Sequence, residues 1–151
     1  MPSTAEVIST LNDLIETCRD GQEGFRAAAE GVRSAALREQ FHSYALQRAS
    51  FASELQEEVR RLGGAPEQTG SLVASLHRGW MGLRAALEGG DDHAVVSECE
   101  RGESVALETY RAALGRDMPA SVRATVERQF AEVKEAHNLL GNLENRSDAG
   151  T

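Results

Sequence analysis

Glu103 is the residue whose type and position could do chemistry. It lies in the stretch Asp91–Leu114, where small and apolar side chains recur at alternating steps of three and four residues. That spacing is typical of a bundle helix whose apolar seam faces the core. A carboxylate on such a seam is either a metal ligand or one half of a buried ion pair. The residues that face Glu103 therefore decide what this centre does.

Three other amphipathic segments each carry one polar residue on an otherwise apolar seam. The predicted helices span residues 4–32, 35–62 and 119–143, and their polar seam residues are Gln22, Arg48 and Gln129. Each polar seam residue lies about a dozen residues from a turn, which is roughly 18 Å of helix. Together with Glu103 they are expected to form one polar layer near the middle of the molecule.

The turns predict how the helices connect. Short breaks at residues 31–34 and 115–118 join the long helices into two antiparallel hairpins. Between the hairpins, regularly spaced leucines and Trp80 predict a shorter helix over residues 71–88. A connection of this length can run along the whole bundle, which makes the second and third long helices parallel. The predicted fold is therefore all-α: a ferritin-like four-helix bundle whose single long crossover contains an extra short helix.

The composition of the polar layer favours a structural role over a metal site. In di-metal bundles of this topology, two helices each supply a Glu and the other two each supply a Glu-x-x-His. Arg48 and Gln129 stand at the places where those motifs would begin, and a central guanidinium repels metal cations. We therefore interpret Arg48 and Glu103 as a buried ion pair, with the amides of Gln22 and Gln129 satisfying the remaining donors and acceptors. No catalytic residue, cofactor or metal ion is expected.

The alternative is a rearranged iron site with ferroxidase-type activity. The candidate ligands for that site are Glu103, Glu100, Glu132 and His137. Glu39-x-x-His42 matches the ligand motif, but both residues lie off the seam near the start of their helix. We interpret this match as helix surface.

Small residues flank the predicted layer. Gly21 and Gly102 each precede a polar seam residue, which indicates either close approach of two helices, the commoner cause, or room for the Arg48 side chain. Cys18 and Cys99 are expected on opposite sides of the layer, too far apart for a disulfide. Both are interpreted as small core residues.

The composition limits the classes of function. The chain has 151 residues, of which 40% are hydrophobic, and a formal charge of −8. An acidic surface repels phosphate groups, so neither nucleic-acid nor anionic-membrane binding is expected. The sequence begins with no signal-peptide pattern, and a cytoplasmic location is expected. One domain is predicted over residues 1–145, followed by a disordered tail over residues 146–151.

Several segments together resemble a bacterial family of ferritin-like bundle proteins that is catalogued only as a domain of unknown function. These segments are CRDGQEGFRAAAEGV, YALQRASFASELQEEVRRLGG, SLHRGW, GGDDHAVVSECERGE and VERQFAEVKEAH. The resemblance implies a ferritin-like fold and a cytoplasmic bacterial protein, but no activity. We expect a non-enzymatic protein that acts through its acidic faces and the helix of Trp80. A homodimer with the 71–88 helix in its interface is compatible with this hypothesis.

Overall fold

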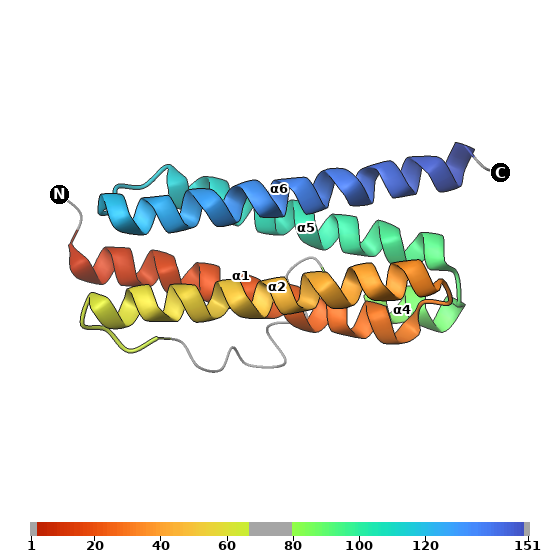
Figure 1. Ribbon diagram of the computed structural model, residues 1–151, viewed down its shortest axis with the longest axis horizontal. Coiled ribbons are helices and arrows are strands. Elements are labelled where there is room, and N and C mark those ends of the chain that lie inside the picture. Colours follow the sequence, from red (N-terminus) through yellow and green to blue (C-terminus); the bar gives the residue numbers. More distant parts are fainter. Residues whose placement is uncertain (1–2, 67–79, 150–151) are drawn as a thin grey trace.

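The computed structural model describes residues 3–66 and 80–149, with side chains up to residue 144 (Figure 1). The helices in these ranges are α1 (Thr4–Gly31), α2 (Ala35–Arg61), α4 (Leu83–Gly89), α5 (Asp92–Leu114) and α6 (Ala120–Ala149). The described residues contain no strand, so the all-α prediction is confirmed. None of the helices in this part of the chain is both long and apolar enough to cross a membrane.

The ends of the helices differ from the prediction in two places. Of the helix predicted over residues 71–88, only residues 80–88 can be compared, because residues 71–79 lie outside the described ranges; residues 80–82 are not helical, and α4 begins only at Leu83. The interface predicted on that helix falls largely on the same residues. α6 continues past the expected end at Leu143 to Ala149, so it includes residues that were predicted to form a disordered tail. Neither glycine nor proline interrupts residues 142–149 to stop it.

Polar side chains cap the starts of three long helices. In each case a side-chain oxygen accepts a hydrogen bond from a backbone N–H of the first turn, which has no partner within the helix. The capping residues are Ser3, Ser34 and Asp91, with donor–acceptor distances of 3.1, 3.2 and 3.0 Å. These residues fix where α1, α2 and α5 begin.

The carboxylate of Asp92 establishes the direction of the second hairpin. Its two oxygens accept hydrogen bonds from the backbone N–H groups of Arg33 and Ser34, both at 2.9 Å. The start of α5 therefore meets the α1–α2 turn, and α2 and α5 begin at the same end of the molecule. They run in parallel, as predicted (Figure 1).

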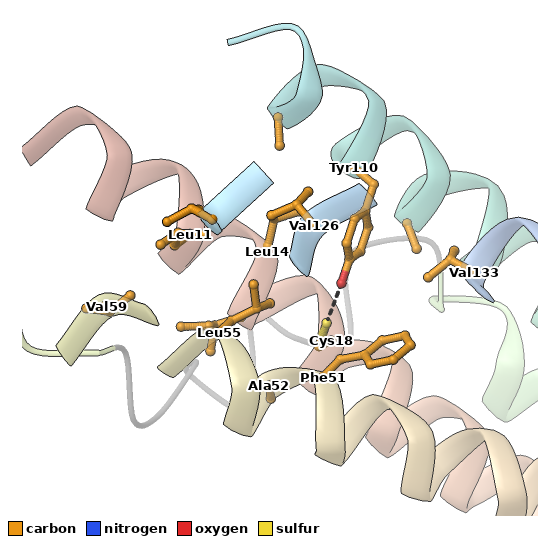
Figure 2. Packing of buried hydrophobic residues seen from close by; sticks show 14 of the residues in the cluster. Leu11, Leu14, Cys18, Phe51, Ala52, Leu55, Val59, Tyr110, Val126 and Val133 are labelled. Carbon is orange, nitrogen blue, oxygen red and sulfur yellow. Dashed lines mark hydrogen bonds between the residues drawn. The ribbon is translucent and has the colours of Figure 1, made fainter. Parts of the chain in front are cut away.

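The helices bury two apolar clusters that lie one above the other along the bundle. α1 packs against α2 and α5, α5 packs against α6, and the contact between α2 and α6 is the thinnest of these four. One cluster contains Leu11, Leu55 and Val126 near the free end of α1 (Figure 2), and the other contains Phe25 and Trp80 near the α1–α2 turn. The polar centre lies between the two clusters.

Candidate functional site

Arg48 of α2 and Glu103 of α5 form a buried ion pair at the centre of the bundle. Each terminal nitrogen of the guanidinium donates to one carboxylate oxygen, and the Nη2–Oε2 distance is 2.6 Å. Arg48 is 1% exposed and Glu103 is fully buried. Two parallel charge-assisted bonds give this pair a defined geometry as well as strength. The ion pair predicted from the sequence is confirmed.

Arg48 is held by an aromatic and glycine-lined cage as well as by Glu103. Its guanidinium carbon lies 5.4 Å from the ring centre of Phe25 and 5.9 Å from that of Phe51, which are distances of cation–π contact. A Cβ atom on Gly21 would lie 3.3 Å from Arg48 Cγ, so this glycine leaves room for the arginine stem. Burial by itself lowers the pKa of Arg48, but the Glu103 carboxylate more than offsets that effect and the pKa is raised. The pair therefore stays ionised.

Gln129 does not join this layer, and the prediction that it does is wrong. Its Oε1 accepts a hydrogen bond from the Tyr110 hydroxyl at 2.7 Å, and its Nε2 donates to the Phe51 carbonyl at 3.3 Å. The same hydroxyl lies 3.1 Å from Cys18 Sγ (Figure 2). Gln129 thus belongs to a separate polar chain inside the first apolar cluster, level with Tyr110 and about two helical turns from Glu103.

The α5–α6 turn explains why Gln129 lies about two helical turns from Glu103. Arg123 of α6 donates to the Leu114 carbonyl at the end of α5, at 3.0 Å, and to the Arg116 carbonyl in the turn that follows, at 2.7 Å. The first turn of α6 therefore extends beyond the end of α5 instead of starting level with it. The prediction assumed that residues equally far along the chain from the turn lie at the same level, and this assumption placed Gln129 too close to Glu103.

Gln22 is also outside the polar layer. It is half-buried on the flank of α1, and no hydrogen bond within the described residues joins it to Arg48, Glu103 or Gln129. Gly21 takes the core position at this level. The expectation that both glutamine amides satisfy the ion pair is therefore wrong, since Arg48 itself fills both oxygens of Glu103.

Trp80 explains the glycine that precedes Glu103. A Cβ atom on Gly102 of α5 would lie 2.3 Å from Trp80 Cε2, and one on Gly24 of α1 would lie 2.4 Å from Trp80 Cδ2. The indole therefore occupies a slot between the two helices, and it also meets the Phe25 ring edge-on at 5.1 Å between centres. Close approach of helices, the explanation favoured from the sequence, is wrong for Gly21 and Gly102.

The position of Trp80 changes its expected role. Trp80 is 4% exposed, so it belongs to the core and cannot present a surface to a partner. This role of Trp80 was not predicted from the sequence. The available signal was the pair of glycines, Gly24 and Gly102, because glycine is unfavourable inside a helix unless something requires the space.

The remaining candidate ligands do not gather around Glu103. His137 Nε2 lies 3.1 Å from Glu100 Oε1 and 2.9 Å from Ser104 Oγ, on the α5–α6 flank. Glu132 faces Arg128 at 3.7 Å instead. Among the side chains that the structure describes, in residues 3–66 and 80–144, no three His, Cys, Asp or Glu are arranged to hold a metal ion. Glu39 and His42 are both exposed, as expected.

The Glu100 carboxyl is nevertheless perturbed. Burial raises its pKa first, and the neighbouring carboxyl of Glu144 raises it further, while His137 acts in the opposite direction. Ser97 Oγ donates to Glu144 at 3.2 Å and helps to hold that carboxyl in place. Two carboxyl groups and one imidazole therefore share the flank where α6 meets α5.

The two cysteines are free, buried and separated, as predicted. Cys18 belongs to the first apolar cluster and Cys99 to the second. Burial raises the pKa of Cys18 to about 11, although the bond to Tyr110 opposes this, and burial also raises the pKa of Cys99. Thiols in this state are poor nucleophiles.

Residues 6–116 match the family described as domain of unknown function DUF2383. The match spans α1, α2, α4 and α5, and so includes Arg48, Trp80 and Glu103, whereas α6 follows it. No curated protein matches the chain.

Proposed function

Because the chain belongs to the DUF2383 family, whose description assigns no activity, we propose its function from its own residues: a non-enzymatic ferritin-like bundle of the bacterial cytoplasm that acts as an interaction protein. Two features of the connectivity support the ferritin-like class. α2 and α5 run in parallel, and a single long connection that ends in α4 separates the two hairpins.

The observation that carries the proposal is the bidentate Arg48–Glu103 pair. In di-metal bundles, carboxylates at the centre are available to metal ions. Here the Glu103 carboxylate has both oxygens engaged by a guanidinium that is itself enclosed by Phe25 and Phe51. A cation entering this site would have to displace a buried positive charge, which is electrostatically unfavourable.

With its centre closed by an ion pair, the bundle offers only its surface for function. That surface is strongly acidic, since the chain carries a formal charge of −8. Charge of one sign on a rigid helical scaffold favours recognition of partners of the opposite sign. We therefore place the function in binding a protein partner.

Ferrous iron tests this proposal against a rearranged metal site. Protein purified without chelator is incubated with ferrous iron, and bound metal and iron oxidation are measured together. We expect neither bound metal nor oxidation above background. Tightly held metal that is lost in Glu103→Ala overturns the proposal at its centre, whereas metal lost only in Glu100→Ala places a site at the His137 contact of 3.1 Å on the flank. Either result makes the protein a metal-binding one.

A further inference from the structure

We infer that the groove between α2 and α6 is a docking site for a basic amphipathic segment of another protein, an inference that rests on the proposed function and names its surface. The groove holds about 350 Å³. Its lining residues are Gln40, Tyr44, Gln47, Glu132, Glu135, Ala136 and Leu139. It lies along the side of the bundle where two long helices touch least.

The groove offers an apolar floor with an exposed anchor point. Tyr44 and Ala136 are buried beneath it, at 8% and 2% exposure, and Leu139 on its α6 wall is 38% exposed. Leu139 is one of the few large apolar side chains exposed in the described residues. The Tyr44 hydroxyl remains a donor, because burial raises its pKa to about 12. An apolar side chain from a partner could pack between the Tyr44 ring and Leu139.

The charges around the groove select the kind of partner. Both charged residues in its lining are carboxylates on α6: Glu135, and Glu132, which also lies 3.7 Å from Arg128. The α2 wall contributes the amides of Gln40 and Gln47. A second copy of this acidic chain would bring like charges together, which disfavours self-association. A helix with one apolar stripe flanked by lysine or arginine complements both the floor and the carboxylates.

A comparison with a second groove supports this choice. The groove between α1 and α5 holds about 290 Å³ and contains Asp13 and Glu108, but it also contains Arg116. Arg116 already donates to Thr10 there, at 3.0 Å. That groove combines both signs of charge and has no exposed large apolar side chain, so it lacks the selectivity of the α2–α6 groove.

The test uses a fluorescent synthetic helix with leucine on one stripe and lysine on the other faces, titrated with the full chain at physiological ionic strength. We expect saturable binding that Leu139→Ser weakens about tenfold and Glu135→Gln about threefold. Leu46→Ser and Glu127→Gln are matched controls, because both residues are exposed and neither lines the groove. Both controls should bind the probe as the unmodified chain does.

Three outcomes of the peptide titration would overturn the inference. They are no saturable binding, equal binding of a scrambled peptide of the same composition, and equal weakening by the control variants, which indicates general attraction of a polycation. A concentration-dependent dimer that Leu139→Ser abolishes also overturns it, because a second copy then covers the groove. None of these results bears on iron binding, so failure of the docking site is distinguishable from failure of the non-enzymatic assignment.

Discussion

Arg48→Met should destabilise the protein by about 3–5 kcal/mol, because it leaves a buried carboxylate without its partner. Glu103 is fully buried, and both of its oxygens accept from Arg48. A domain of this size is stable by about 5–15 kcal/mol, so the loss is a large fraction of the total. Chemical denaturation followed by circular dichroism measures it directly.

The double variant Arg48→Met/Glu103→Gln separates the pair from its packing. It removes both charges and should recover much of the loss, which corresponds to a coupling free energy of about 2 kcal/mol or more. The exposed pair of Arg60 and Glu57 is the control, because its side chains are 50% and 58% exposed and its coupling should be about 0.5 kcal/mol or less. A silent Arg48→Met, or no recovery in the double variant, would refute the account of a buried, mutually dependent pair.

Three further predictions concern Trp80, Cys18 and the Glu100 flank. Gly102→Ala should cost about 1–3 kcal/mol and shift the fluorescence of the single tryptophan, because the new Cβ would overlap the Trp80 ring; Gly141→Ala, which has open space, should be neutral or stabilising. Cys18, whose pKa is raised to about 11, should resist thiol reagents in the native protein and react in denaturant. The raised pKa of Glu100 means that the folded state binds its proton more tightly than the unfolded state, so its contribution to the free energy of unfolding should rise as the pH falls through that pKa. Glu144→Gln should reduce this rise in denaturation series from neutral to mildly acidic pH.

The partners of the ion pair could be predicted because each is the one charge on an otherwise apolar seam. Seam spacing identifies which residues face the core, and a cation and an anion in one core must meet or remain unpaired at high cost. Asp92 was visible as a helix-start residue, but its hydrogen bonds to the α1–α2 turn depend on two segments far apart in the sequence. The parallel course of α2 and α5 was nevertheless implied by the length of the crossover.

The register of α6 could not be predicted, because seam spacing is nearly unchanged when a helix slides by two turns. For example, a slide of two turns would bring Val133 to the position that Val126 occupies along the bundle, and both side chains would still face the core. What fixes the register is the turn, where Arg123 reaches the carbonyl of Leu114. A hydrogen bond from a long side chain to the end of another helix leaves no periodic signal in the sequence. Gln129 was therefore predicted level with Glu103, although it lies about two helical turns away, level with Tyr110.

The prediction that Gln22 faces the polar layer was wrong for a different reason. Adjacent positions on a helix point only about 100° apart. Assigning Gln22 to the seam in place of Gly21 therefore still leaves steps of three or four residues to the neighbouring seam positions. A glycine contributes no apolar signal, and Gly21 was therefore passed over for its polar neighbour. The role of Gly21 becomes clear only from the structure, where the aliphatic part of Arg48 packs against it.

The same degeneracy indicates why a bundle would keep a buried ion pair. Sliding α5 along α2 by one heptad would set Arg48 against Val96 and Glu103 against Leu55, with the apolar seams otherwise matched. Each charge would then lie unpaired in an apolar cluster, at a cost of several kcal/mol. The apolar seams alone distinguish these two arrangements weakly, and the pair distinguishes them strongly. We therefore expect its main contribution to be the selection of one register of α2 and α5, which fixes the relation of the two hairpins, even where its net contribution to stability is small.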